Sequence, residues 1–341
     1  MKKKLVSLAL ATALCAGTVL AGCESKTETS ETTETTTETT TTEVAADAHY
    51  TIGICQLVQH VALDAATQGF EDALTELLGA DHVTFDYQDA AGESATCATI
   101  VNTFASNNYD LILANATAPL QAAYTATSTI PILGTSVTDY ATALQIDNWT
   151  GATGYNVSGT SDLAPLAEQA AMIKELFPDC QTVSILYCSA EPNSKYQADV
   201  MVEELAALGI TATQFSFADS NDIALVCQQA CDACDVMYIP TDNTAASSTG
   251  IIDSVASAAG IPIVAGEEGI CQGCGVATLS ISYYDLGYAT GKMAYDILVG
   301  GADIKTMQVQ YAPNVTKEYI PERATALGIT IPDTYEAIAT E

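Results

Sequence analysis

Apolar residues follow two different periods along most of the chain after about residue 48. Short apolar runs rich in β-branched residues are separated by longer segments in which apolar positions recur every three or four residues. The short runs that predict buried strands are 50–55, 82–87, 110–115 and 130–135 in the first half, and 182–188, 211–217, 236–240 and 261–266 in the second. Strand–helix–strand alternation of this kind predicts parallel sheets covered by helices on both faces.

The segments between these runs have the spacing of amphipathic helices. In 62–79, apolar residues lie at three- and four-residue intervals, namely Leu63, Ala66, Phe70, Ala73, Leu74 and Leu77. Later helices are expected to end at Gly209, Gly260 and Gly328, each of which is followed by isoleucine. Glycine at such a position can adopt the left-handed conformation that closes a helix, and the β-branched residue then begins an extended run. The pattern therefore predicts a chain of repeated helix-to-strand junctions.

Two blocks of these units are joined near 151–165. After an apolar run at 276–282 come a helical segment at 283–301 and a late strand at 306–312, so the end of the chain can return to the first block and cross back. The pattern predicts an α/β fold of two doubly wound parallel-sheet lobes, with a hinge of several crossovers and an interlobe cleft at the C-terminal ends of the strands. Such lobes can close around a small molecule.

The first 23 residues have a different character. Three lysines precede an uncharged, mainly apolar run of 16 residues from Leu5 to Leu20. Since a bilayer needs about 20 such residues, we interpret this run as part of a signal peptide and not as a transmembrane anchor. Its end, Leu20-Ala21-Gly22-Cys23, resembles a bacterial lipobox, in which the cysteine is lipid-modified after cleavage. We therefore predict a signal peptide at 1–22 and lipidation of Cys23.

The next segment, 23–47, is rich in threonine and glutamate and has few apolar side chains to bury. We expect it to be a disordered tether between the lipid and the folded residues. Without its three leading lysines, the chain keeps seven Lys and Arg against 42 Asp and Glu. Nucleic acid and anionic membrane surfaces are poor partners for such a polyanion, so the lipid is the only membrane attachment that we expect.

Ligands of doubly wound folds bind just beyond the C-terminal ends of the parallel strands. Polar residues occupy these positions, and none of them is lysine or arginine. The candidate ligand-binding residues are Gln56, His60, Thr117, Thr135, Ser136 and Asp139 from the first block, Ser161 from the joining segment, and Asn193, Asp242, Asn243 and Glu267 from the second block. The set suits an amino acid zwitterion, because a carboxylate can accept the ammonium while hydroxyls and helix N-terminal amides hold the carboxylate.

Helix capping is an alternative explanation for part of this set, because small polar side chains often cap the first amides of a helix. The positions typical of N-caps are those of Thr117, Ser161, Asn193 and Asn243. Asp242, at the junction in "YIPTDNTAAS", can either cap the following helix or receive a ligand's ammonium group. The sequence leaves both roles open.

Nine cysteines remain in the folded region, at positions 55, 97, 180, 188, 227, 231, 234, 271 and 274. "CQQACDAC" has the C-x3-C-x2-C spacing of an iron–sulfur motif, and together with "CQGC" it offers four thiolates that can hold zinc. However, Cys227, Cys231 and Cys234 fall on the predicted helical face that packs on the sheet. Buried free thiols behave as small hydrophobes, so we favour core packing over a metal site or disulfides.

The sequence has no pattern typical of common catalytic sites. G-x-S-x-G, H-E-x-x-H and G-x-x-x-x-G-K-[ST] are all missing, and the whole chain has three histidines. We therefore expect a binding protein with no enzymatic activity and no cofactor or bound metal.

A resemblance to a known family is carried by segments spread over most of residues 50–295. They are "IGICQLVQHVALDAATQGF", "ANATAPLQAA", "GTSVTDY", "YNVSGTSD", "PTDNTAAS", "AGEEG" and "SISYYDLGYATGKMA". In this order they resemble the substrate-binding lipoproteins of ABC transporters that have the type 1 periplasmic-binding fold, in the group associated with aromatic amino acid uptake. The resemblance implies one lobe of 48–157 plus 283–311 and a second of 158–282 plus 312–341. It also implies an extracytoplasmic, lipid-anchored protein that delivers an aromatic amino acid to an ABC permease and its ATPase.

Two positions depart from the family pattern, which usually has proline where this chain has Val61 and Tyr140. We expect both residues on cleft-facing loops.

Two rival functions also remain. A sugar or nucleoside binding protein would commonly stack rings on tryptophan, and the sole tryptophan, Trp149, lies in the approach between the lobes. A cysteine-ligated metal enzyme would carry metal when purified.

Overall fold

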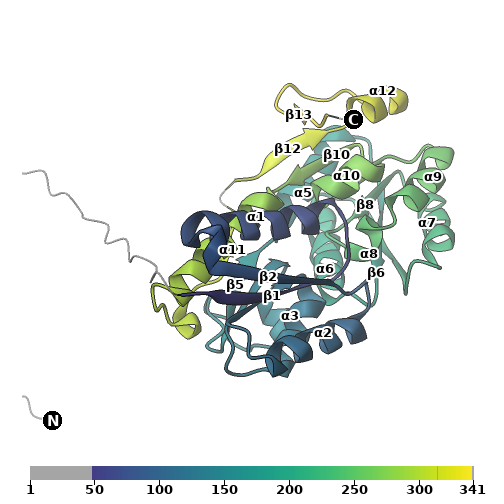
Figure 1. Cartoon of the computed structure of the whole chain (residues 1–341). Helices are drawn as coiled ribbons and strands as arrows, with labels where there is room; N and C mark the ends of the chain where they lie inside the picture. Colours follow the sequence, from purple (N-terminus) through teal and green to yellow (C-terminus); the bar gives the residue numbers. More distant parts are fainter. Residues whose placement is uncertain (1–47, 313, 340–341) are drawn as a thin grey trace, which may run out of the picture. The chain divides into compact units, whose positions relative to one another are not determined.

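The computed structural model describes residues 48–312 and 314–339, which form two β-sheets with helices on both faces of each (Figure 1). The first sheet has the strand order β11-β5-β4-β3-β1-β2, and all its neighbouring strands are parallel. Its strands are β1 (Tyr50–Gln56), β2 (Val83–Asp89), β3 (Leu111–Asn115), β4 (Ile132–Val137), β5 (Val157–Ser161) and β11 (Gln310–Tyr311). This sheet and its helices are called the first lobe below.

The second sheet has the order β13-β12-β10-β9-β8-β6-β7. Its strands are β6 (Thr182–Cys188), β7 (Thr211–Phe217), β8 (Val236–Ile239), β9 (Ile263–Ala265), β10 (Ala277–Ser280), β12 (Thr316–Tyr319) and β13 (Glu336–Ala337). β12 runs antiparallel to β10, whereas the other neighbours are parallel. This sheet and its helices form the second lobe.

Helices cover both faces of each sheet and bury separate apolar layers. The first lobe has α1 (Val61–Leu78), α2 (Ser94–Ser106), α3 (Thr117–Ala126), α4 (Tyr140–Leu144) and α11 (Tyr283–Leu298). The second has α5 (Leu166–Leu176), α6 (Pro192–Ala207), α7 (Ile223–Cys231), α8 (Asn243–Ala246), α9 (Thr249–Ala259), α10 (Glu268–Cys274) and α12 (Pro321–Leu327). Short 3-10 turns occur at Ala80–His82 and Ile304–Thr306.

Helices α1 and α11 lie side by side on one face of the first sheet (Figure 1). Glycines permit this close approach, because a Cβ on Gly69 would overlap the Tyr284 carbonyl and a Cβ on Gly287 would overlap that of Ala66. The late helix of the sequence is thereby fixed to the first lobe.

The predicted strands are confirmed with shifts of a few residues at their ends, and the strands at 182–188 and 211–217 have the predicted bounds. Gly209, Gly260 and Gly328 have φ values of 75°, 70° and 67°, which confirms left-handed glycines after these helices. Leu77 is a correction: it is 37% exposed, and Leu78 is buried in its place.

The joining segment at 151–165 also differs from expectation, because it contains a strand. β5 pairs with β4 in the first sheet, and the boundary expected between 157 and 158 falls inside it. Its sequence, "VSGTS", has one strongly apolar residue, so hydrophobic periodicity could not identify it. The late strand expected at 306–312 is only β11, two residues long.

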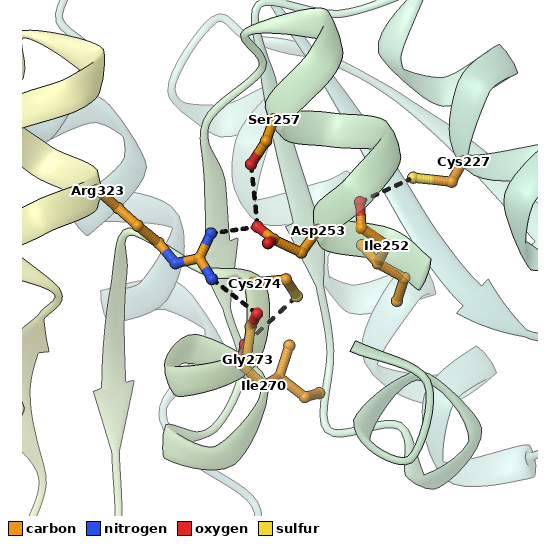
Figure 2. Close-up of polar contacts among 8 residues, drawn as sticks. All are labelled: Cys227, Ile252, Asp253, Ser257, Ile270, Gly273, Cys274 and Arg323. Carbon is orange, nitrogen blue, oxygen red and sulfur yellow. Dashed lines mark hydrogen bonds and ion pairs between the residues drawn. The ribbon is translucent and has the colours of Figure 1, made fainter. Parts of the chain in front are cut away.

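The end of the chain is attached to the second lobe through α12. Arg323, the only arginine in the sequence, forms an ion pair with Asp253 of α9 and donates a hydrogen bond of 2.7 Å to the Gly273 carbonyl (Figure 2). Ser257 also donates to Asp253. These contacts join α12, α9 and the end of α10.

The expected signal peptide, the lipid-modified Cys23 and the Thr- and Glu-rich tether lie outside the described residues. Within 48–312 and 314–339, no helix combines the length and apolar character needed to cross a membrane.

Candidate functional site

The first sheet ends in a row of polar side-chain atoms that lack a hydrogen-bond partner. Among the described residues, six buried side-chain atoms have no partner, and they are His60 Nδ1, Asp89 Oδ2, Asn115 Oδ1, Ser136 Oγ, Asp162 Oδ1 and Thr278 Oγ1. The first five lie at or shortly after the C-terminal ends of β1, β2, β3, β4 and β5, which are neighbours in one sheet. Buried polar groups without partners are uncommon and costly, so such a row indicates that a further molecule completes it.

The backbone is strained in the middle of this row. Ala116, directly after β3, has φ 103°, and Ser136, near the end of β4, has φ 54°. The two residues are adjacent, because the Ala116 amide donates to the Thr135 carbonyl across the strand pair at 3.0 Å. Strained positive φ values at non-glycine residues tend to cluster at functional sites, where the surrounding structure supports the strain. Ser136 therefore combines a strained backbone with an unpartnered hydroxyl.

His60 contributes a hydrogen-bond acceptor to the row. Its Nε2 lies 3.3 Å from Oδ1 of Asn243, which comes from the second lobe. The Asn243 amide nitrogen donates to Glu191, so Oδ1 is the acceptor and His60 Nε2 carries the proton. Burial lowers the pKa of the His60 imidazole, which favours this neutral form. Nδ1 then carries no proton and can accept a hydrogen bond from a ligand.

Asp162 supplies a carboxylate at the hinge side of the row. The Tyr283 hydroxyl donates to Oδ2 at 2.9 Å, whereas Oδ1 is unpartnered. Both side chains are buried, and burial raises the pKa of the Asp162 carboxyl against the opposing effect of the polar Thr138 and Tyr283 side chains. The pair connects the chain after β5 to the start of α11.

The strand ends of the second lobe differ, because their carboxylates are already occupied by protein donors. Glu191, buried after β6, accepts hydrogen bonds from the amides and side chains of Asn243 and Thr244 at 2.7–3.1 Å. Asn193 adds a longer contact of 3.4 Å to the same carboxylate. Glu191 thus fixes the start of α8.

Asp242 and Glu267 are occupied in the same way. Asp242 accepts from the Ala245 amide at 2.8 Å, as the N-cap of α8, and from the Cys188 amide at 2.6 Å. Glu267 is the N-cap of α10 and accepts from the Ile270 and Gly269 amides. Burial raises the pKa of Asp242 to about 8 and that of Glu267 to about 7, against the opposing effect of these amides. Of the two roles that the sequence leaves open for Asp242, the structure shows the capping contact.

A cavity of about 430 Å³ opens between the two sets of strand ends. It is lined by the loops after β1 and β2 and the start of α3 from the first lobe, and by the segments after β6, β7 and β8 from the second. Leu57, Val58, Ala118 and Pro192 give it apolar surface, while Glu191 and Asn243 are polar. Its volume lies in the usual range for small-molecule sites, about 300–1,000 Å³.

Other predicted residues make contacts inside one lobe. Gln56 is fully buried and bonded to Val58, Asp64 and Thr67, and Thr135 lies 3.2 Å from the Thr160 hydroxyl. Ser161 donates to the Thr138 carbonyl at 2.8 Å. Asp139 caps α4 by accepting from the Thr142 amide.

Four expected N-caps are not N-caps. Thr117, Asn193 and Asn243 are the first or second residues of their helices, and Ser161 ends β5. The actual N-caps of α3, α6 and α8 are Ala116, Glu191 and Asp242. The expectation was displaced by one or two residues along the chain, which is the usual uncertainty of helix starts read from sequence.

Sequence reasoning did not include Asp162 or Tyr283 among the candidates. Asp162 directly follows Ser161 in "SGTSD", so its position after a strand was a usable signal once that strand was known. Tyr283 could not have been found in this way, because it contacts Asp162 from a helix 121 residues later in the chain.

The two residues that depart from the family pattern both begin helices, and they differ in exposure. Val61 begins α1 and is 56% exposed, whereas Tyr140 begins α4 and is buried. The Tyr140 hydroxyl donates to the Thr160 carbonyl at 3.1 Å, and its ring stacks on Trp149 at 6.5 Å between centroids. The expectation of a cleft-facing Tyr140 is therefore wrong, because its ring fills the core beneath β4 and β5.

The cysteines of the described residues are unpaired, and eight of the nine are buried. Core packing is confirmed for Cys227 and Cys231, which lie with Ile223 on the inner face of α7. Cys234 is a correction, because it lies beyond the end of α7 and is only partly buried. Within the described ranges, no group of three or more His, Cys, Asp or Glu side chains is arranged to hold a metal ion.

Comparisons with known proteins agree on one family. The sequence model for the family described as ABC transporter substrate binding protein matches residues 51–341. A tyrosine-binding protein of Clostridioides difficile (strain R20291) is 34% identical over 300 residues, which cover 87% of this chain and 85% of that protein.

Solved structures at 30% identity or more have a similar fold, and they include the following two. An ABC domain from Streptococcus pneumoniae in complex with L-Trp has a TM-score of 0.82 at 30% identity, covering 85% of this chain and 100% of that chain. The ligand-free, open structure of a substrate-binding protein with adhesive properties from Clostridium difficile has a TM-score of 0.66 at 34% identity, covering 86% and 100%.

Proposed function

Because the chain belongs to the ABC transporter substrate-binding protein family, we propose that it captures an aromatic amino acid between its two lobes and delivers it to an ABC permease. Proteins of this family bind small molecules outside the cytoplasm and are not enzymes. The aromatic ligand is supported by the tyrosine-binding relative and by the L-Trp complex, each similar over most of this chain.

The observation that carries the proposal is the row of unpartnered polar atoms across five neighbouring strand ends. The row offers acceptors, a hydroxyl and a carboxylate, which suit a zwitterion. The cavity beside it has apolar walls that suit a ring. A sugar is disfavoured, because Trp149 stacks on Tyr140 in the first lobe and does not line the cavity between the strand ends.

The ligand's carboxylate would lie at Ser136 and the start of α3. The first-turn amides of a helix have no intrahelical acceptor and favour negative charge. The Ser136 hydroxyl is a further donor beside this helix start and has no protein partner. We assign carboxylate binding to Ser136 and the amides of Thr117 and Ala118.

The ring would extend toward β1 and the cavity. β5 and β1 are separated by three strand spacings, about 14 Å in all, which is comparable to an aromatic amino acid hydrogen-bonded at both ends. His60 Nδ1, near the end of β1, can accept a hydrogen bond from a phenol O–H or an indole N–H. The contact of His60 with Asn243 supports an arrangement in which the lobes are closed over this site.

The similarity to solved structures also favours closed lobes. The structure matches the L-Trp complex better than the open, ligand-free protein, although its sequence identity to the open protein is higher. We propose two lobes close to the bounds expected from the sequence, 48–157 with 283–311 and 158–282 with 312–341, but with the first crossover moved to the residues after β5, so that 158–161 belong to the first lobe.

The protein is further proposed to be anchored outside the cytoplasm by a lipid on Cys23, after removal of 1–22, with 23–47 as the tether. The lipobox-like sequence and the uncharged run before it support this. Cys23→Ala should leave the protein unprocessed or release it, so that the mature form is lost from the membrane fraction. Unchanged membrane fractionation of the mature form would contradict the anchor.

Calorimetric titration of the purified protein with L-tyrosine, L-tryptophan and L-phenylalanine tests the proposed function. Mass spectrometry of any small molecule released on denaturation identifies a ligand that co-purifies. Saturable binding of one or more of these amino acids is expected. Binding of glucose, myo-inositol or adenosine in place of all three would contradict it.

A further inference from the structure

We propose that Asp162 receives the ligand's ammonium group and that Tyr283 is the positioning residue that holds the Asp162 carboxylate. This assignment rests on the proposed capture of an amino acid. Asp162 follows β5 at the first crossover between the lobes, and Tyr283 begins α11 at the second. The ammonium would therefore bind where both crossovers meet.

The geometry leaves one side of the carboxylate available. Tyr283 donates to Oδ2 at 2.9 Å and thereby fixes the orientation of the carboxyl plane, while Oδ1 has no partner. The exposed fractions of Asp162 and Tyr283 are 2% and 5%, so bulk water does not solvate the pair. An ammonium group has three donors and no acceptor, and one of its protons can complete Oδ1.

The charges around Asp162 also favour a cation. Glu267 is buried and close enough to Asp162 for the charge of Asp162 to raise the Glu267 pKa. The ion pairs found among the described residues, Lys195–Asp199, Lys317–Glu175 and Arg323–Asp253, do not include either carboxylate. An isolated buried carboxylate is expensive, and a ligand ammonium group would offset that cost.

The other buried carboxylates at the strand ends are poorer receptors. Asp242 and Glu267 each accept protein amides at both oxygens, and Glu191 accepts from Asn243 and Thr244. A ligand ammonium at any of them would compete with donors that fix α8 or α10. Oδ1 of Asp162 has no protein donor that a ligand ammonium group would have to displace.

The test compares a ligand with and without its amino group. Binding of L-tyrosine and of 3-(4-hydroxyphenyl)propionate, which lacks the amine, is measured by calorimetry for the wild type and Asp162→Asn. The amide keeps the size of the side chain and can still accept from Tyr283, but it carries no charge. We expect L-tyrosine to bind about 10- to 150-fold more weakly, while the deaminated acid changes little.

Two variants control this comparison. Asp110→Asn removes a carboxylate at the opposite end of the first sheet, where it accepts the Thr51 amide at 2.7 Å, and should leave both affinities unchanged. Tyr283→Phe keeps the Asp162 charge but frees its orientation, and should weaken L-tyrosine by about 2- to 10-fold while sparing the deaminated acid. It also tests the assignment should Asp162→Asn fold poorly.

The outcomes separate this assignment from the proposed function. If the wild type binds the deaminated acid as tightly as L-tyrosine, or if Asp162→Asn and Tyr283→Phe weaken both ligands equally, the ammonium assignment is wrong and the binding function stands. If the wild type binds none of L-tyrosine, L-tryptophan and L-phenylalanine, the proposed function and the assignment fail together.

Discussion

The strand ends of the two lobes have similar polar residues but opposite degrees of completion. At the first lobe, five neighbouring strands each end near a side-chain atom without a partner. At the second lobe, Glu191, Asp242 and Glu267 accept several protein donors each, and the one unpartnered atom in its described residues, Thr278 Oγ1, lies within β10.

This difference indicates a division of labour. Under the proposed function, the first lobe presents the chemical groups that a ligand would complete, whereas the carboxylates at the strand ends of the second lobe already have protein donors. We call the C-terminal strand ends of the first and second sheets the first edge and the second edge. Substitutions at the first edge should therefore lower ligand affinity, whereas substitutions at the second edge should lower stability.

Glu191→Gln should have the largest effect on folding. The amide keeps the size of the side chain but loses the charge and turns one acceptor into a donor, which leaves buried donors of Asn243 and Thr244 unpaired. The free energy of unfolding should fall by about 3 kcal/mol, measured by urea denaturation. A loss below about 0.5 kcal/mol would show that the second edge is not held by this carboxylate.

Ser136 tests the first edge. Ser136→Ala should weaken binding of the aromatic amino acid by about 3- to 10-fold, because one donor to the ligand carboxylate is lost. Ser136→Gly should weaken it similarly yet raise the unfolding free energy by about 1 kcal/mol, since glycine adopts a φ of 54° without strain.

Thr278→Val is the matched control for Ser136, because it also removes an unpartnered buried hydroxyl but lies within the second sheet. Calorimetric affinity should be unchanged in this variant. Equal weakening by Ser136→Ala and Thr278→Val would remove the distinction between the two edges.

The second edge should also make stability depend on pH. The folded-state pKa values of Asp242, about 8, and Glu267, about 7, lie above those of the free side chains, so the folded protein retains protons that the unfolded chain releases. This contribution is complete below the unfolded pKa values and is lost as pH rises through 7 to 8.

Melting of the ligand-free protein should accordingly occur at a higher temperature at pH 5.5 than at pH 8.5. For a change of 1 kcal/mol, the expected difference is about 2–4 °C. Asp242→Asn should make the melting temperature depend less on pH than in the wild type. Comparing the two proteins removes the general effect of the acidic surface, which they share. An unchanged slope in the variant would assign the pH dependence to other groups.

The smallest expected effect concerns ligand choice at the other end of the row. His60→Phe removes the Nδ1 acceptor and should weaken L-tyrosine by about 2- to 10-fold while leaving L-phenylalanine, which has no ring donor, nearly unchanged. Competition calorimetry would measure the ratio of the two affinities. Parallel weakening of both ligands would point to the Asn243 contact in place of ring recognition.

Much of the fold follows from local pattern. The inner strands β3 and β8 are mainly apolar runs because they are buried on both faces, and the closing glycines have the positive φ that their position requires. β5 escaped the pattern because small polar residues replace apolar ones where Gly159 packs against β4 and Tyr140. That substitution depends on a neighbour outside the local sequence.

The site was predictable in position but not in role. The rule that ligands bind beyond parallel strands selected His60 and Ser136, and the structure places both near strand ends of the first sheet with an unpartnered atom each, while their role in binding stays a prediction. It could not tell that Asp242 and Glu267 are satisfied by nearby amides, since that depends on side-chain geometry. The Asp162–Tyr283 pair depends on two distant crossovers that converge only in the folded chain.

The buried cysteines allow the opening of each lobe to be timed separately. Cys55 and Cys97 lie in the first lobe, whereas Cys188, Cys227 and Cys271 lie in the second. An exposed thiolate attacks an alkylating reagent, so each of these side chains should react only when its own lobe opens. Pulsed alkylation followed by peptide mass spectrometry would then give two independent opening rates from one unlabelled protein, with partly buried Cys234 as the fast internal reference.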